Sequence, residues 1–225
     1  MSDSGIYQHQ WFDGTDISLP VGKVVCIGRN YAEHAKELNN PIPSEPLLFM
    51  KPATSLVALS NELTLPKAFG EVHYEAEISV LIGEKVQNVT DLNVAEAALA
   101  GIGTALDLTL RDLQSTLKSK GQPWEKAKAF DGACPVSTFV PRERLGALDQ
   151  LEIRLDLDQV TVQAGNSSDM LTGVLELICY CSQFFTLMPG DVVLTGTPKG
   201  VGVLRPDQDI TLTLANQFGW SARTC

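Results

Sequence analysis

The stretch "EVHYEAEISVLIG" (residues 71–83) alternates with a period of two, which is typical of a β-strand. One face of this strand is apolar and consists of Val72, Tyr74, Ala76, Ile78, Val80 and Ile82. The other face is mixed and consists of His73, Glu75, Glu77, Ser79 and Leu81. A strand this apolar rarely carries two neighbouring carboxylates on one face, because buried charge is costly unless it is paired or coordinates a metal.

The composition is that of a globular protein. The chain has 225 residues, of which 44% are hydrophobic and 20% charged, and this length suits one substantial domain. The net charge of −10 leaves no positive field for nucleic acid or an anionic membrane, so we expect neither partner. An acidic substrate must therefore be attracted locally, by a few positive side chains or by a bound cation.

The cysteines and the most apolar segment indicate an intracellular, soluble chain. The five cysteines are scattered without zinc or redox spacing, and the first residues show no signal-peptide pattern, so we expect reduced thiols and a cytoplasmic location. The segment 170–188 is interrupted by Thr172, Glu176 and Gln183, which favours a buried amphipathic helix over a membrane span.

The first part of the chain predicts a strand over residues 21–28 and a helix over 30–38. The segment 39–46 has three prolines in six residues, which favours an extended loop. A helix hinged at "GRN" (28–30) could close over a site, although a rigid surface connection explains the pattern equally well.

The rest of the chain alternates between short strands and a few helices. Asp91 can cap a short helix, a strand covers 101–110, and a helix from 111 is stopped by Gly121. Further elements are a hairpin over 151–165 that turns near Asp158, a long helix over 168–187, a strand over 190–196 and a final strand over 208–215. Because short alternating strands dominate, we predict an α+β, β-rich fold.

Three acidic residues form a candidate metal site. Residues i and i+2 of a strand point the same way at roughly 7 Å spacing, so Glu75 and Glu77 could share a hard divalent cation such as Mg²⁺. Asp107 lies on the polar side of the leucine-rich strand 101–110 and would join them if the two strands are neighbours. The alternative is a solvated polar face, which a single Glu-x-Glu would favour.

A histidine and a carboxylate are spaced for a general base. His34 and Glu37 stand at i and i+3 of the predicted helix, and a carboxylate beside an imidazole fixes its tautomer and raises its basicity. A surface histidine beside a surface glutamate is the commoner explanation of such a pair. His73 is interpreted as a neighbour that supports the carboxylates.

Two further segments could bind an anion. Lys126 and Lys128 stand around a bend, and either could neutralise a substrate carboxylate, although surface lysines are common. "TGTPKGVG" (195–202) is not a nucleotide-binding loop, but a tight turn could expose backbone N–H groups and the Thr197 hydroxyl to an anion.

Taken together, these segments resemble the fumarylacetoacetate hydrolase family, specifically its small single-domain members related to acylpyruvases and oxaloacetate decarboxylases. The resemblance rests on "KVVCIGRNYAEHAKEL", "EPLLFMKP", "VHYEAEISVLIG", "GTALDLTLRDLQ", "GQPWEKAKAFDGACPVS" and "GDVVLTGTPKGVG". It implies a mixed β-sandwich roll with peripheral helices and an N-terminal lid helix, usually as a homodimer. Residues 1–20 would be an N-terminal extension and 21–225 a single catalytic domain. Gln159 stands where many relatives place glycine, which weakens the predicted turn.

The resemblance also implies roles for individual residues. An octahedral Mg²⁺, or Mn²⁺, would be held by Glu75, Glu77 and Asp107. The catalytic pair of the lid helix would be His34 and Glu37, assisted by Lys128. Substrate contacts would come from Arg29, Gln114 and Thr197.

The implied activity is the Mg²⁺-dependent hydrolysis of a carbon–carbon bond in acylpyruvates, such as acetylpyruvate or fumarylpyruvate. His34 would activate water, and the leaving carbanion would be a metal-bound pyruvate enolate. The same chemistry serves an oxaloacetate decarboxylase, a keto–enol tautomerase or a 2-hydroxyhepta-2,4-diene-1,7-dioate isomerase. An alternative of another class is a metal-binding protein without catalytic activity, in which the carboxylates only brace the fold.

Overall fold

A computed structural model describes residues 7–38, 41–60 and 62–225 of the chain. The strands are β1 (Val24–Gly28), β2 (Leu47–Lys51), β3 (Leu56–Ala58), β4 (Glu62–Leu63), β5 (Val72–Tyr74), β6 (Ala76–Ile82), β7 (Leu99–Leu106), β8 (Thr109–Leu110), β9 (Cys134–Val136), β10 (Val140–Pro141), β11 (Glu152–Leu157), β12 (Val160–Asn166), β13 (Val192–Leu194), β14 (Gly202–Leu204), β15 (Asp209–Leu214) and β16 (Phe218–Thr224). The α-helices are α1 (Ala32–Glu37), α2 (Leu92–Ala97), α3 (Arg111–Ser119), α4 (Glu125–Lys128) and α5 (Val174–Phe184). This strand-rich content confirms the predicted α+β, β-rich class.

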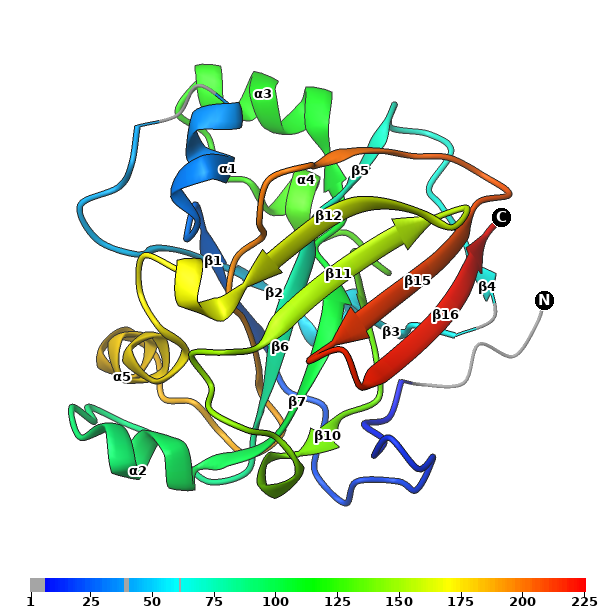
Figure 1. Ribbon diagram of the computed structural model, residues 1–225. Coiled ribbons are helices and arrows are strands. Elements are labelled where there is room, and N and C mark those ends of the chain that lie inside the picture. The colour runs from blue at the N-terminus through cyan, green and yellow to red at the C-terminus, as the bar shows by residue number, and fades with distance from the viewer. Residues whose placement is uncertain (1–6, 39–40, 61) are drawn as a thin grey trace.

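Two large sheets pack face to face. The first has the strand order β2-β1-β13-β6-β7-β9-β3, with β10 paired to β7, and mixes parallel and antiparallel pairs. The second has the order β12-β11-β15-β16-β4 and lies in front of β6 and β7 in Figure 1. Strand β11 contacts β6 and β15 contacts β7, and the core between them contains Ile78, Leu155 and Leu212. The result is the curled mixed sandwich that the resemblance implied.

The predicted single strand over residues 71–83 is wrong in one respect, because it is divided at Glu75. Strand β5 belongs to a small sheet with the order β14-β5-β8, whereas β6 belongs to the large mixed sheet. The strand predicted over 101–110 is also divided, because β7 ends at Leu106 and β8 begins at Thr109. Both interruptions lie where one sheet gives way to the other.

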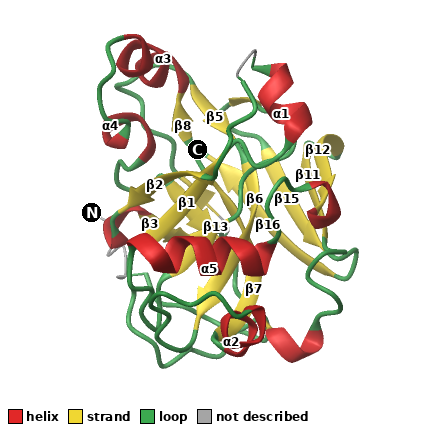
Figure 2. Ribbon diagram, turned by 90° about the vertical axis from the view of Figure 1, so that its left-hand side faces the viewer, coloured by secondary structure: helices red, strands yellow, loops and turns green. Residues whose placement is uncertain are grey.

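The helices cluster in two places. Helices α1, α3 and α4 gather at one end of the sheets, near β5, as Figures 1 and 2 both show. Helix α5 packs beside α2 and buries Val174, Leu177, Ile178 and Cys181, which are spaced for one helical face. Among the described residues no helix is long and apolar enough to cross a membrane.

The long helix predicted over residues 168–187 is shorter than expected. Its first residues form a 3₁₀ turn (Ser167–Asp169), and α5 begins only at Val174. In between, the backbone N–H groups of Leu171 and Thr172 donate to the carbonyl and the side-chain oxygen of Asn30, at 2.8 and 2.9 Å. These long-range hydrogen bonds replace the local ones that a helix would use.

Other elements agree with their predictions or extend them. The hairpin of β11 and β12 turns at Asp158 and Gln159, whose φ angles of 49° and 67° are those of a tight hairpin turn. Strand β15 is not the last strand, because the predicted final strand over 208–215 is followed by β16.

The segment before β1 lies against the large sheet. The ring of His9 contacts the carbonyl of Gly190 at 3.0 Å, and Ile17 is buried in a cluster with Phe139. Trp11 forms a parallel bridge with Phe139. The described residues before β1 therefore pack against the large sheet and the Phe139 region.

Candidate active site

Three buried carboxylates converge at the point where the two strands are divided. Each of Glu75, Glu77 and Asp107 offers an oxygen, and these oxygens all lie within 4.8 Å of one another. The three side chains are almost completely buried, with the residues 6%, 2% and 1% exposed. The condition stated for the sequence is met, because β6 and β7 are paired neighbours and the three carboxylates converge.

The register of the strands explains this convergence. Val72 pairs with Leu110 and Ala76 pairs with Leu106, so the same register places Glu75 opposite Asp107. The regular ladder is interrupted there, and the backbone N–H of Asp107 still donates to the carbonyl of Glu75 at 2.8 Å. Glu77 follows on β6, two residues further along the same face.

Lys128 lies inside the acidic cluster. Its Nζ donates to Glu75 Oε2 at 2.8 Å, to Asp107 Oδ2 at 2.6 Å and to Thr109 Oγ1 at 2.7 Å. Burial alone would lower the pKa of Lys128, but the charges of Asp107 and Glu75 outweigh it and raise that pKa above its ordinary value. Lys128 is therefore a permanent positive charge at the site, whereas Lys126 is exposed.

Glu75 has the opposite environment to Glu77. Burial would raise the pKa of Glu75, but Lys128 and Arg111 lower it below its usual range. Glu77 instead accepts a hydrogen bond from the backbone N–H of Gly196 at 2.6 Å, and burial together with the charges of Asp107 and Glu75 raises its pKa well above the ordinary value.

This donor set fits a hard divalent cation. The three groups are carboxylates, the ligand type that Mg²⁺ and Mn²⁺ prefer, and they share one buried space. A cation between them would favour the ionised form of Glu77, which its two acidic neighbours disfavour. Glu75, Glu77 and Asp107 are thus suited to hold the cation that the sequence predicted.

His34 and Glu37 form the expected pair on α1. His34 Nδ1 lies 3.4 Å from Glu37 Oε2, and the histidine is buried. Burial lowers the pKa of His34, and the opposing charges of Glu75 and Glu37 do not outweigh it. The imidazole is therefore neutral at neutral pH, the form that can accept a proton.

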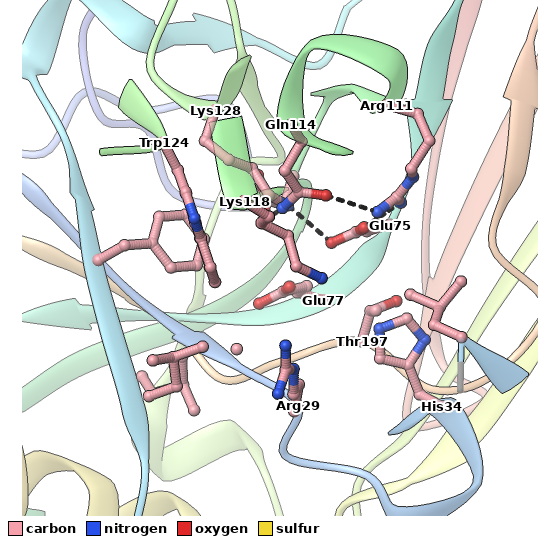
Figure 3. A pocket seen from close by; sticks show the side chains of 16 residues that line it. Arg29, His34, Glu75, Glu77, Arg111, Gln114, Lys118, Trp124, Lys128 and Thr197 are labelled. Carbon is pink, nitrogen blue, oxygen red and sulfur yellow. Dashed lines mark hydrogen bonds and ion pairs between the residues drawn. The ribbon is translucent and has the colours of Figure 1, made fainter. Parts of the chain in front are cut away.

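A single pocket joins these groups, as Figure 3 shows. Its lining includes every predicted site residue except Glu37: Arg29, His34, Glu75, Glu77, Asp107, Gln114, Lys128 and Thr197. Glu37 does not line the pocket itself but contacts His34, which does. His73 does not line it, and its Nε2 lies 3.8 Å from Glu71 instead, so the interpretation of His73 as a supporting neighbour of the carboxylates finds no contact.

The sequence reasoning missed several residues of the pocket. Arg111 donates to Gln114 Oε1 at 2.8 Å and also forms an ion pair with Glu75, and Lys118 lines the same wall. Their signal was present, because positions 111, 114 and 118 recur on one face of α3. Phe49 and Trp124 were missed too, as was Lys51, which does not line the pocket but forms an ion pair with Asp107.

A β-rich core that sets an acidic cluster against four cationic side chains and a neutral histidine defines a class of protein, an enzyme for small anionic substrates. The family model "Fumarylacetoacetate (FAA) hydrolase C-terminal" matches residues 23–219. The chain belongs to the fumarylacetoacetate hydrolase family, as its resemblance predicted.

Individual relatives in this family are similar over most of their length. The chain is 48% identical over 209 residues to the oxaloacetate tautomerase YcgM of Escherichia coli (strain K12), covering 92% of this chain and 95% of that protein. It is 42% identical over 189 residues to a mitochondrial oxaloacetate decarboxylase of Dictyostelium discoideum, covering 84% and 86%. The crystal structure of fumarylpyruvate hydrolase from Pseudomonas aeruginosa with Mn²⁺ and pyruvate matches with a TM-score of 0.90 and 34% identity, covering 100% of this chain and 97% of that one.

Proposed function

We propose that this protein catalyses the keto–enol tautomerisation of oxaloacetate in the pocket between α1 and α3. The observation that carries the proposal is the position of a buried, neutral His34 in the same pocket as the acidic cluster and four cationic side chains. The similarity to an oxaloacetate tautomerase over nearly the whole chain supports the same substrate.

The cationic side chains suit a substrate with two carboxylates. Arg29 and Lys118 point into the same space from opposite walls of the pocket, and Lys128 lies deeper beside Glu75 (Figure 3). In a protein with a net charge of −10, these groups supply the local positive potential that an acidic substrate requires. Arg29 and Lys118 would bind one carboxylate of the dianion.

The acidic cluster would hold the divalent cation. A cation bound by Glu75, Glu77 and Asp107 would supply Lewis-acid polarisation of a 2-oxo group, which would make the adjacent carbon more acidic. Lys128 stays protonated and stabilises negative charge that develops next to this cluster.

His34 would move the proton. Its neutral imidazole accepts a proton from C3 of the keto form and delivers it to the 2-oxo oxygen, so that one proton leaves and one arrives. Glu37 stabilises the imidazolium that exists between the two transfers. The reverse sequence converts the enol form to the keto form.

The experiment that tests the proposal follows the loss of enol absorbance when the enol form of oxaloacetate is added. The wild-type protein with Mg²⁺ or Mn²⁺ should accelerate ketonisation well above the rate in buffer. Excess EDTA and the Glu77→Gln variant should each abolish the acceleration. An unchanged buffer rate with the metal-loaded wild type contradicts the proposal.

Hydrolysis of acylpyruvates is the second candidate, and it was the main prediction from the sequence. The His34–Glu37 pair favours it, since the same base could activate water for attack on the distal carbonyl. The similarity to a fumarylpyruvate hydrolase is compatible with it at lower identity. Rates on acetylpyruvate, fumarylpyruvate and oxaloacetate, measured side by side with and without Mg²⁺, separate the two candidates.

Decarboxylation of oxaloacetate and isomerisation of a dienoate would use the same cation. Isomerisation needs His34 to transfer a proton, whereas decarboxylation does not. In a His34→Ala variant, hydrolysis and tautomerisation should collapse, whereas cation-driven loss of CO₂ should persist. A protein that only binds metal would melt at a higher temperature with Mn²⁺ and turn over none of these oxo acids.

We also propose Mg²⁺ as the native cation, with Mn²⁺ as a functional substitute, and a homodimer in the cytoplasm. The carboxylate donor set supports either cation. Calorimetric titration with Mg²⁺ and Mn²⁺ tests the choice of cation. Light scattering coupled to size-exclusion chromatography tests the homodimer.

A further inference from the structure

A fully buried lysine lies beneath the pocket. Lys51 is the last residue of β2, an edge strand of the large sheet, and is 0% exposed. Phe49, two residues earlier, lines the pocket. Residues two apart on a strand share a face, so this face of β2 is directed at the site.

Lys51 contacts both the acidic cluster and the backbone that carries Lys128. Its Nζ lies 2.8 Å from Asp107 Oδ1, while Lys128 occupies the other oxygen, Oδ2, of the same carboxylate. Lys51 also donates to the carbonyl of Ala133 at 3.1 Å and to the carbonyl of Lys128. These two carbonyls stand at the two ends of the connection between α4 and β9.

A gain in folding stability does not by itself explain why this ammonium group is buried. A buried ion pair is often no more stabilising than an apolar side chain of the same volume, because desolvation offsets the attraction. Two of the acceptors that Lys51 contacts belong to the site, namely a carboxylate of the acidic cluster and the carbonyl of Lys128, and the third is the carbonyl of Ala133. The contacts of Lys51 link the Asp107 carboxylate to the backbone of Lys128.

We propose that Lys51 is a positioning residue for the reaction, which it affects through Asp107 and Lys128 without touching the substrate. It turns the Asp107 carboxylate so that its two oxygens have fixed partners, and it holds the backbone of Lys128 so that the ammonium reaches Glu75 and Asp107 together. This inference rests on the proposed function, because it concerns the cation site and the charge that serve that reaction.

Phe49 provides a second contact of β2 with the same lysine. The Nζ of Lys128 lies 5.3 Å from the centroid of the Phe49 ring, a distance at which a cation interacts favourably with an aromatic face. Strand β2 therefore contacts Lys128 at its ammonium through Phe49 and at its carbonyl through Lys51.

The chain offers a matched control for Lys51 at a distance from the pocket. Lys23 forms an ion pair with the buried Asp191 and donates to the carbonyl of Thr186 at 2.9 Å. It repeats the pattern of a lysine bonded to a buried aspartate and a backbone carbonyl, yet none of these residues lines the pocket. Lys23→Met and Lys51→Met thus remove similar contacts in different places.

The experiment measures Mn²⁺ affinity by calorimetry, kcat and KM for oxaloacetate, and thermal stability for both variants. Lys51→Met should weaken Mn²⁺ binding by about tenfold or more, the range found when groups that orient metal ligands are removed. Its kcat should fall by at least tenfold with KM within threefold. Lys23→Met should lower the melting temperature but keep Mn²⁺ affinity, kcat and KM within twofold of the wild type.

The inference is overturned if a folded Lys51→Met protein binds Mn²⁺ and turns over oxaloacetate as Lys23→Met does. If Lys51→Met does not fold, Lys51→Gln takes its place; its shorter, neutral side chain removes the ion pair with Asp107, so Mn²⁺ affinity is then the deciding measurement, and wild-type affinity overturns the inference. Failure of the proposed function is distinguishable, since a wild type without turnover on oxaloacetate still reports on Lys51 through its Mn²⁺ affinity.

Discussion

The carboxylate of Glu37 accepts the backbone N–H of Gly200, with distances of 3.0 and 3.1 Å to its two oxygens, while Oε2 lies 3.4 Å from the imidazole of His34. One carboxylate therefore attaches helix α1 to the loop between β13 and β14 and also lies beside a ring nitrogen of the histidine. The loop contributes Thr197 to the pocket, so Glu37 couples two of its walls.

Gly200→Ala should disturb this attachment. Gly200 has a φ of +100°, and a Cβ there would lie 2.2 Å from the carbonyl oxygen of Val162, so the backbone must move and withdraw its N–H from Glu37. We expect a loss of about 1–3 kcal/mol in the free energy of unfolding and a lower kcat. Gly146→Ala is the control, because a Cβ at Gly146 meets nothing within 4 Å. Equal kcat values for the two variants would show that the attachment does not matter.

His34→Ala should remove the proton-transfer group and leave the cation site intact. General acid–base catalysis contributes roughly 100- to 10,000-fold, so we expect a loss of kcat in that range on oxaloacetate. Mn²⁺ affinity should be unchanged, because His34 is not one of the three clustered acids. His73→Gln is the control, since His73 does not line the pocket. A His34→Ala enzyme with wild-type kcat would exclude His34 as the base.

The pH dependence of kcat/KM should report the neutral form of His34. Because burial lowers the pKa of His34 below the ordinary 6.5, the imidazole is unprotonated at neutral pH and the rate falls only as the pH drops below about 6.5. Glu37 opposes this lowering, so Glu37→Gln should move the acid limb of the profile to still lower pH. A shift of that limb to higher pH in the variant contradicts the assignment.

Glu77→Gln should separate cation binding from folding. The pKa of Glu77 is raised well above its ordinary value, so without a cation this side chain is favoured in its neutral form, which glutamine imitates. The ion-free variant should melt at or above the wild-type temperature. The wild type should gain about 2.7 kcal/mol of stability at a Mn²⁺ concentration of 100 times Kd, and the variant should lose most of that gain in thermal scans.

His9 should make stability depend on pH. Its Nε2 contacts the carbonyl of Gly190 and its Nδ1 contacts the hydroxyl of Tyr7, both at 3.0 Å, and burial lowers its pKa. In the unfolded chain His9 has a pKa of about 6.5, so below that pH the unfolded chain binds more protons than the folded protein. The contribution of His9 to the free energy of unfolding is therefore complete above about pH 6.5 and is lost as the pH falls through the pKa of the folded state. Melting temperatures between pH 8 and 5 should fall less steeply for His9→Gln. A variant with the wild-type slope excludes His9 as a source.

Local patterns predicted many elements because their causes are local. Alternation predicted the strand around Ile78, the side chain of Asp91 caps α2 as expected, and the turn at Asp158 forms even with Gln159 beside it. Helical spacing brought His34 and Glu37 together, and the family resemblance then selected them as a catalytic pair. Each of these signals depends on residues that are only a few positions apart.

Long-range contacts account for what the sequence did not predict. Arg111 was not selected, because its spacing on α3 does not reveal that the fold brings its guanidinium to Glu75. The helix expected to begin at 168 is delayed because Asn30, far away in the chain, takes the hydrogen bonds of Leu171 and Thr172. Lys51 gave no signal at all, because nothing in its neighbourhood marks a buried lysine.

The sequence by itself determined the alternating strands, the acidic residues on one strand face, the His34–Glu37 spacing on a short helix and, through its characteristic segments, the family. Tertiary structure alone decided that two strands break together at Glu75 and Asp107, so that carboxylates from both meet in one buried space. The reason is that strand pairing and burial join residues that are distant in the chain, and their free energy is absent from any local pattern.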